Sequence, residues 1–306
     1  MEPGIALSLD AVIVAVTEGR PRILTVLRDD GPRAIPSGPL DPKRDATLEL
    51  GLRRWISSQT GLDVGYVEQL YTFGDRDRQR GQSASRLLSV GYLALMREAQ
   101  PSPGAAWIDW YELFPWEDHR DGVPAVLTRR TLPLLRAWAD GQPDRLGRVH
   151  VTFGVEPAPW DPIRTLERYE LLYEAQLVEE SYRDREREPP PDLAAGVELV
   201  YDHRRIAATA LSRLRGKLTY RPVVFELMGE TFILTQLQHT VEALVGQRLH
   251  KQNFRRLLRR GRLVEGTGSY YESTGGRPAE LFRFRGDVVR ERPRPGVSLP
   301  RLRRSP

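Results

Sequence analysis

Two consecutive segments near the carboxyl end decide the fold: FILTQLQHTVEALVG (232–246) and LHKQNFRRLLRRG (249–261). In the first, apolar residues recur at helical spacing, with Thr235 at the position of an N-cap and Gly246 at that of a helix terminator. The buried stripe of this helix is formed by Leu237, Val241, Leu244 and Val245. Because only a few residues separate the segments, they predict two helices joined by a short turn.

The second predicted helix has a strongly basic outer face. Phe254, Leu257 and Leu258 form its apolar side, which at about 100° per residue turns basic and amide side chains outward. The candidate DNA-contacting residues are His250, Lys251, Gln252, Asn253, Arg255, Arg256 and Arg259. Arginine pairs with guanine and an Asn or Gln amide pairs with adenine, so this face suits a major groove. No acidic residue lies between Lys251 and Arg262 to neutralise it.

The segment after this helix predicts a β-hairpin. A polar Ser/Tyr/Gly stretch leads to GGRPAELFRFR (275–285), whose apolar residues suit a strand that returns from a loop. Helix, short turn, basic helix and hairpin occur in the order of a winged helix-turn-helix domain. Arg277, at the hairpin tip, is a candidate contact to the minor groove or to phosphate. Further candidate phosphate contacts are Arg213, Arg215, Lys217 and Tyr220.

Charge is distributed unevenly along the chain. Residues 201–306 contain 22 Lys/Arg against 9 Asp/Glu, whereas residues 1–200 contain 24 against 32. A basic third attached to an acidic body indicates a polyanion-binding module carried by another domain. From charge alone, a solvated arginine-rich surface explains the same imbalance.

Composition excludes several classes of protein. The chain has 306 residues, of which 40% are hydrophobic and 28% charged, enough for at least one large core. No window approaches the roughly 18 consecutive apolar residues of a membrane span, and the N-terminus does not resemble a secretion signal. We therefore expect a cytoplasmic protein that does not bind membranes. With no cysteine and five scattered histidines, the sequence predicts neither disulfides nor a His/Cys metal site.

The N-terminal third alternates between strand and helix patterns. Strands are expected at 5–16, 22–29, 66–73 and 87–96. The first two form a hairpin, and an amphipathic helix at 45–62 ends at Gly61. This order predicts a mixed α/β domain.

The middle of the chain is predicted to be helical. Helices are expected at 127–139 and 163–182. A linker is expected at 184–196, where charged residues, three consecutive prolines and a glycine oppose a helix. Beyond it we expect, in order, a helix at 203–218, an extended piece at 220–228 and a short strand at 231–234.

The stretch GPLDPKRDATLELGLRRWISSQTGL (38–62) resembles a Nudix box, in which a glycine loop leads into a glutamate-bearing helix. Aligned on the closing glycine, the matching residues are Arg54, Ile56, Gly61 and Leu62. The family's three glutamates fall instead on Trp55, Ser58 and Gln59. Those glutamates hold magnesium for diphosphate hydrolysis, and Ser and Gln cannot replace two charges. Glu49 alone is too few carboxylates for such a cluster, so the resemblance implies neither catalytic residues nor a metal site.

Other segments resemble Nudix-related transcriptional regulators of the NrtR and NadQ kind. QLYTFGDRDR (69–78) and LLSVGYLAL (87–95) resemble their strand–loop–strand segment. LHKQNFRRLL (249–258) and GGRPAELFRF (275–284) resemble their winged helix. The segments that are most similar to the NadQ branch are FPWED (114–118), 166–184 and 202–228.

This resemblance implies both a fold and a function. The implied α/β fold has a Nudix-like α/β/α sandwich sensor domain with a helical extension (1–155), a connecting helix and linker (156–195), and a winged helix domain with a flexible tail (196–306). The implied function is repression of NAD-biosynthesis genes by a homodimer on a palindromic operator in double-stranded DNA. The resemblance also implies that a nucleotide effector of the NAD, ATP or ADP-ribose class binds the Nudix-like domain and changes DNA affinity, and that no cofactor is required.

The resemblance also implies an effector site near the glycine loop and the loop at 73–86. Candidate ligand contacts, which offer cations for phosphate and an aromatic surface for a base, are Arg28, Arg33, Phe73, Asp75, Arg76, Arg78 and Arg86. The aromatic segment at 107–116 is an alternative stacking surface, although its density is more typical of packing between domains or subunits.

Two other functions fit parts of the sequence. An active Nudix hydrolase of ADP-ribose-like diphosphates would depend on Glu49 and would use the basic end only to attract anions. A non-specific RNA- or DNA-binding adaptor would carry aromatic residues among its basic ones for base stacking, and the helix at 249–261 has few.

Overall fold

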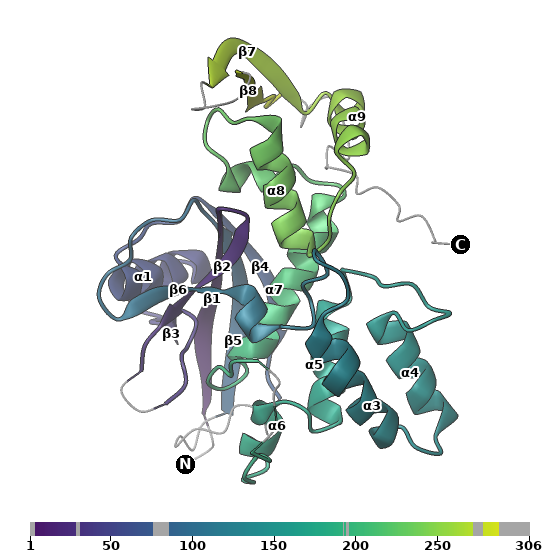
Figure 1. Cartoon of the computed structure of the whole chain (residues 1–306). Coiled ribbons are helices and arrows are strands. Elements are labelled where there is room, and N and C mark those ends of the chain that lie inside the picture. Colours follow the sequence, from purple (N-terminus) through teal and green to yellow (C-terminus); the bar gives the residue numbers. More distant parts are fainter. Residues whose placement is uncertain are drawn as a thin grey trace.

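The computed structural model describes residues 4–28, 31–75, 86–191, 193, 196–271 and 278–287. Figure 1 shows a sheet at the N-terminal side, a group of helices beside it, and a small unit of two strands and a helix beyond α8. Within the described residues, no helix combines the length and the apolar character that a membrane crossing requires.

A mixed six-stranded sheet forms the N-terminal body (Figure 1). Its strands are β1 (Ile5–Thr17), β2 (Arg20–Val26), β3 (Ser37–Pro39), β4 (Tyr66–Phe73), β5 (Arg86–Leu95) and β6 (Ala105–Asp109). They lie in the order β4-β5-β1-β2-β6, with β3 beside the first half of β1. Only β1 and β5 run parallel among these pairs in the described sheet. The four strands predicted from the sequence are present, and β6 is one that the sequence did not predict.

Helices cover both faces of the sheet. Side chains alternate between the faces along each strand, so the apolar residues of β1 supply a core on either side. Leu9 and Ile13 of β1 pack with α1 (Leu48–Thr60). Val12, on the opposite face, belongs to the core that contains α7 (His203–Leu218). This arrangement confirms the predicted α/β/α sandwich.

A helical extension follows β6 and lies beside the sheet (Figure 1). Its elements are α2 (Trp110–Leu113), η1 (Leu127–Thr131), α3 (Leu132–Trp138), α4 (Pro143–Phe153), α5 (Thr165–Glu174) and α6 (Glu179–Arg183). The prediction of one helix over 163–182 is wrong, because Gln176 adopts a φ of 57° and separates α5 from α6. The aromatic segment contributes the buried side chains of Trp110, Phe114 and Trp116, so it serves packing.

The carboxyl-terminal part has the winged helix order that the sequence predicts. It consists of η2 (Val223–Leu227), α8 (Leu234–Val245), α9 (Lys251–Gly261), β7 (Val264–Tyr271) and β8 (Ala279–Phe284). Phe232 pairs with Phe282 beside the hairpin. Two details differ from the prediction. The piece at 220–228 contains a 3-10 helix, and Ile233 rather than Thr235 precedes α8, with its N–H donating to the Gln236 side chain at 3.0 Å.

Helix α7 lies within the predicted DNA-binding domain (196–306) and packs on the sheet and the helical extension, which together we call the sensor body. It contacts β1, β4, β5 and α5. The segment before it is also attached to the body, because Val197 N–H donates to Glu112 O at 2.8 Å and Val200 N–H donates to Arg33 O at 3.0 Å. Helix α7 also contacts η2 and α8, and one apolar core continues from the sheet to Phe254 of α9.

Candidate DNA interface and sensor site

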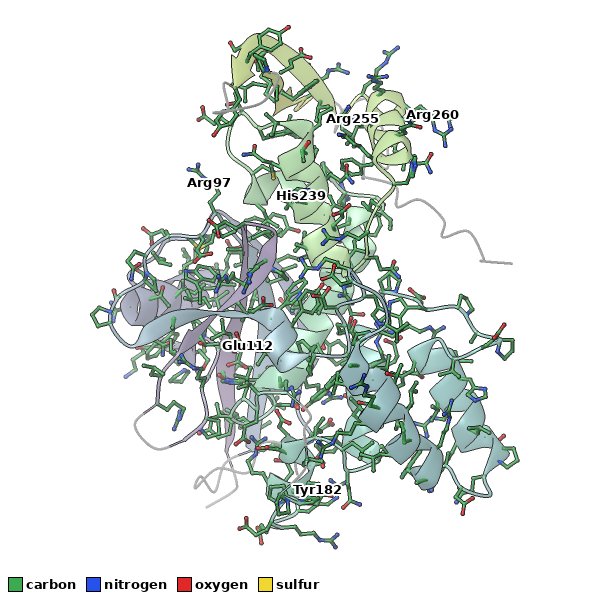
Figure 2. The ribbon with its side chains drawn as sticks, viewed as in Figure 1. Arg97, Glu112, Tyr182, His239, Arg255 and Arg260 are labelled. Carbon is green, nitrogen blue, oxygen red and sulfur yellow. The ribbon has the colours of Figure 1, made fainter. Side chains whose placement is uncertain are left out.

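Helix α9 presents a basic face to solvent while its apolar side holds it in place. Phe254 and Leu258 are fully buried, and the burial of these two anchors fixes the rotation of the helix. The exposed members of the predicted set are Lys251, Gln252, Arg256 and Arg259, and the partly exposed members are Asn253 and Arg255. Figure 2 shows Arg255 and Arg260 on α9 at the end of the molecule away from the sheet. We call Lys251, Gln252, Asn253, Arg255, Arg256 and Arg259 the recognition face.

The arginines of the recognition face are not neutralised by the residues that the structure describes. Arg255, Arg256 and Arg259 form no ion pair with any residue that the structure describes. Arg256 donates a hydrogen bond to Asn253 Oδ1 at 3.2 Å, which leaves the amide hydrogens of Asn253 available. Positive charge without a partner is what phosphate and guanine edges attract.

The hairpin adds two aromatic side chains that the sequence did not single out. Tyr270 and Tyr271 at the end of β7 are 61% and 52% exposed, although large aromatic side chains are usually covered. The polar Ser/Tyr/Gly composition of this segment was the one feature of the sequence that could have indicated exposed tyrosines here. Arg277, predicted at the tip, lies outside the described residues.

The remaining predicted DNA contacts have different surroundings. Arg215 is fully buried, so the prediction that it contacts phosphate is wrong. Lys217 forms an ion pair with Glu68 of β4 and approaches the Tyr66 hydroxyl at 3.3 Å, so it faces the sheet rather than the recognition face. Tyr220 is half-buried in the turn after α7, and His250 is exposed at the start of α9.

The sensor body holds the end of α8 through three carbonyl groups. Tyr111 Oη donates to Ala243 O at 2.7 Å, Arg215 Nε donates to Leu244 O at 2.8 Å, and His119 N–H donates to Gly246 O at 2.8 Å. Helix carbonyls at this end lack partners within the helix, so these donors complete α8. Since α9 begins five residues after Gly246, this end of α8 sets the position from which α9 starts.

A buried ion cluster stabilises this junction. Glu117 accepts hydrogen bonds from Arg168 of α5 and Arg215 of α7, and all three side chains are fully buried. Burial raises the pKa of Glu117, but the charges of Arg168 and Arg215 outweigh burial and place that pKa below its usual value. Glu117 is therefore ionised, and it connects the helical extension to α7.

The predicted effector residues gather around the first turn of α7. Arg28 lies over the Tyr201 ring at 5.8 Å, and Arg33 follows it in the β2–β3 connection. Phe73 lies under Arg205 at 5.5 Å, and Asp75 pairs with the same arginine. Arg86 donates to Gly74 O at 2.8 Å. We call this end of the sheet, together with residues 201–205, the sensor site. Arg76 and Arg78 lie outside the described residues.

The sequence did not single out Asp10, His203 or Arg205 at the sensor site, because they have partners far away in the chain. Arg205 pairs with Glu170 and Asp202 as well as with Asp75. Burial lowers the pKa of Arg205, and the surrounding carboxylates outweigh burial and raise it. His203 Nε2 lies 3.8 Å from Asp10 Oδ1, and Ile35 N–H donates to His203 Nδ1 at 3.2 Å.

Asp10 and His203 do not form an ordinary ion pair. Burial raises the pKa of Asp10 from the usual 3.8 to about 6, although hydrogen bonds from Ser8 and Ser89 oppose the rise. Burial, assisted by the charges of Arg183 and Arg28, lowers the pKa of His203 to about 3. His203 is therefore neutral near neutral pH, and Asp10 Oδ2 is a buried acceptor without a hydrogen-bond partner in the described structure.

The Nudix-like box binds its own loop. Gln59 exchanges two hydrogen bonds with the backbone of Ser37 at 2.8 and 2.9 Å, and Trp55 Nε1 donates to Pro39 O at 2.8 Å. A Cβ atom on Gly38 would lie 2.2 Å from the Trp55 ring, so the loop requires glycine there. Glu49 pairs with Arg53 at 2.8 Å. Among the described residues, no group of three or more His, Asp or Glu side chains is arranged to hold a metal ion.

Comparison with known proteins agrees with this geometry. Residues 224–284 match the family model of the NrtR DNA-binding winged helix domain. The chain is similar to an ADPR-responsive transcriptional repressor, NtrR, from Acinetobacter baylyi, with 24% identity over 289 residues that cover 92% of this chain and 83% of the relative.

Solved structures share the whole fold. Shewanella oneidensis NrtR in complex with a 27mer DNA has 20% identity, covers 93% of this chain and 95% of its own, and gives a TM-score of 0.57. A MutT/nudix family protein from Enterococcus faecalis has 16% identity, covers 93% and 87% of the two chains, and gives a TM-score of 0.55.

The chain therefore joins a Nudix-like α/β body to a winged helix domain of the NrtR type. This agrees with the resemblance to Nudix-related transcriptional regulators inferred from the sequence. The NadQ and NrtR branches are not distinguished by these similarities.

Proposed function

We propose that this protein represses NAD-biosynthesis genes in the cytoplasm and that a nucleotide of the ADP-ribose class controls its DNA affinity. The observation that carries this proposal is the recognition face, whose arginines lack ion-pair partners in the described structure. The Acinetobacter relative is an ADPR-responsive repressor, which favours ADP-ribose over NAD or ATP as the effector.

Residues of α9 have separate roles in this proposal. Arg255, Arg256 and Arg259 contact guanine edges, and Gln252 or Asn253 contacts adenine. His250, Lys251 and Arg277 contact phosphate and hold α9 in register with the groove. Lys217 and Tyr220 are also among the predicted DNA contacts, but the ion pair of Lys217 with Glu68 favours a role in joining the domains.

The effector is proposed to bind at the sensor site. Arg28, Arg33 and Arg86 supply cations for its phosphates, and the same role is assigned to Arg76 and Arg78. Phe73 is buried beneath Arg205, so the half-exposed ring of Tyr201 is the better stacking surface for a base. Asp10 Oδ2 is an acceptor that a hydroxyl group of a ligand can satisfy once α7 moves.

Helix α7 connects the effector to the DNA-binding domain. Its first turn contributes His203 and Arg205 to the sensor site, and its last turns place Arg215 against the end of α8. Sixteen residues at about 1.5 Å each give a rod of roughly 24 Å between the two sites. A shift of α7 therefore changes the support of α9, and coupling of ~1–3 kcal/mol is enough for regulation.

A homodimer is proposed because a palindromic operator presents two equal half-sites. Half-sites one helical turn apart are separated by about 34 Å, so both α9 helices bind only in one relative orientation. A modest rotation of the winged domains then prevents simultaneous binding.

We propose that hydrolysis is not part of this function. Gln59 and Trp55 bind the loop where the family carries glutamates, and Glu49 is paired with Arg53. Incubation with magnesium and ADP-ribose should give no turnover. Turnover that disappears in Glu49→Gln would instead establish the hydrolase alternative.

DNA binding with and without effector tests the regulatory proposal. A target duplex is first selected from a random library by the purified protein. Fluorescence anisotropy with this duplex is then repeated with ADP-ribose, NAD and ATP. We expect ADP-ribose to change the affinity by about 5–150-fold. It should also raise the free energy of unfolding by ~2.7 kcal/mol at a hundredfold excess over its dissociation constant. Unchanged affinity with all three nucleotides would contradict the sensor role.

A further inference from the structure

A separate pocket lies where the sensor body meets the winged helix domain. Its volume is about 660 Å³. Its lining includes Tyr66 of β4 and Lys217 of α7, together with Phe232 and Phe284 of the carboxyl-terminal part. In Figure 1 the chain that precedes α8 lies between the sheet and the hairpin. The pocket is at the last turn of α7, whereas the sensor site is at the first turn, so the two are distinct.

One wall of the pocket is aromatic. Phe225 and Phe284 stack with ring centroids 4.3 Å apart and an interplanar angle of 24°, and Phe232 lies 5.7 Å from Phe225. Phe225 and Phe284 are only half-buried, so part of this apolar surface is accessible. A planar ring placed against it would gain aromatic contact and remove apolar area from water.

The charged groups around the pocket are mixed in sign. Lys217 is already paired with Glu68, and Arg283 is already paired with Glu265. Arg221 is exposed and makes no ion pair with a residue that the structure describes. Glu226 and Glu230 are exposed acceptors on the same lining. Arg221 is therefore the cation available to a ligand anion, and the glutamates suit amino or hydroxyl donors.

We propose that this pocket binds a small aromatic anion of mononucleotide size. A ring stacks on the Phe225–Phe284 wall, a single phosphate pairs with Arg221, and ligand donors reach Glu226 or Glu230. The volume lies within the roughly 300–1,000 Å³ of small-molecule sites. The two glutamates repel a polyphosphate, so the site selects a ligand with few negative charges.

Ligand binding here has a structural consequence for the whole molecule. Both domains supply walls of the pocket, so a bound ligand contacts both and stabilises their present arrangement. The pocket thus offers a second input to DNA binding, independent of the effector at the sensor site.

Calorimetry with adenosine monophosphate as the probe tests this site on the full chain. The titration is carried out in the presence of saturating ADP-ribose, which occupies the sensor site. We expect AMP to bind still, and Arg221→Glu to weaken its binding by at least about tenfold, because a charge-assisted hydrogen bond is lost. The matched control is Arg129→Glu, an exposed arginine on η1, which should bind AMP as the wild type does. Loss of AMP binding with ADP-ribose, or equal affinity in Arg221→Glu and wild type, would overturn the proposal.

A labelling experiment locates the ligand without relying on affinity. The chain contains no cysteine, so a single introduced thiol reacts alone with a maleimide. AMP should slow the labelling of Glu230→Cys at the pocket severalfold, and it should not affect Val123→Cys, whose native side chain is 60% exposed elsewhere. Equal labelling rates of Glu230→Cys with and without AMP would also overturn the proposal.

Discussion

Helices α7 and α9 are both rich in arginine, yet their guanidinium groups have opposite surroundings. On α7, Arg204 and Arg215 are fully buried and paired with Glu180 and Glu117. On α9, Arg256 and its basic neighbours in the recognition face point to solvent. The difference shows that arginine content does not separate a structural helix from a DNA-binding one. What separates them is whether the fold brings carboxylates to the arginines.

The largest expected effect comes from the buried arginine of α7. Arg215→Leu should reduce the free energy of unfolding by about 3–5 kcal/mol, because it removes one partner from a fully buried charge cluster. Urea unfolding measures this change. The matched control is Arg213→Leu on the same helix, where the native side chain is exposed and a change within about 0.5 kcal/mol is expected. Similar losses in both variants would remove the distinction between compensated and solvated arginines.

A second effect concerns pH and the sensor end of α7. Asp10 binds its proton more tightly in the folded protein, so its contribution to stability is present below about pH 3.8 and is lost as pH rises through about 6. Asp10→Asn removes this loss. The free energy of unfolding of the variant, relative to that of the wild type, should therefore increase by up to roughly 3 kcal/mol from about pH 4 to pH 7. Urea unfolding at the two pH values measures the gain.

His203 does not obscure this comparison. The lowered pKa of His203 makes the free energy of unfolding rise with pH between about 3 and 6.5. This rise occurs in both Asp10→Asn and the wild type, so it cancels when the two are subtracted. Exposed Asp63→Asn is the control and should show no pH-dependent difference from wild type. If the difference in free energy of unfolding between Asp10→Asn and the wild type also does not change with pH, Asp10 is not buried in the folded protein.

A smaller effect is expected on DNA affinity from α9. Arg256→Ala should weaken binding to the selected target duplex by about 1–3 kcal/mol and binding to random duplex by less, because a base contact is lost. Its free energy of unfolding should change within about 0.5 kcal/mol, since the side chain is exposed. Anisotropy titrations on both duplexes measure the two affinities. Equal losses on both would reject the base-reading role of Arg256.

The smallest effect concerns two lysines that the sequence treats alike. Lys251→Ala should reduce the dependence of log affinity on log salt by about one, because one phosphate contact is lost. Lys217→Ala should leave this slope unchanged, since Lys217 is paired with Glu68. The measurement is a salt series on random duplex. A reduced slope in Lys217→Ala would return Lys217 to the DNA contacts first inferred from the sequence.

Local patterns predicted the elements but not their long-range partners. The apolar spacing of α8 and α9 and the stop at Gly61 of α1 are local features, and the structure confirms them. Helix α7 was also placed correctly, but its packing on the sheet depends on residues far away in the chain. Arg215 looked like a phosphate contact because its acceptor, Glu117, is 98 residues away.

The sensor site was predictable only in part. The resemblance to a Nudix box directed attention to the loop after β4, and Phe73 and Asp75 do meet α7 there. Asp10 and His203 carried no signal, because each is a single polar residue in an ordinary strand or helix pattern. Their burial follows from the packing of α7 over β1, which no local spacing reveals.

The most direct test removes the uncompensated charges of α9 together. In full-length protein, Arg255→Ala, Arg256→Ala and Arg259→Ala are combined and compared with a charge-matched variant that combines Arg129→Ala, Arg136→Ala and Arg187→Ala at exposed positions on η1, on α3 and after α6. Anisotropy with the selected duplex should show that the α9 variant binds no better than wild type binds random duplex, while the control retains wild-type affinity. Retained affinity in the α9 variant, or an equal loss in the control, would contradict the assignment of α9 as the DNA-reading helix.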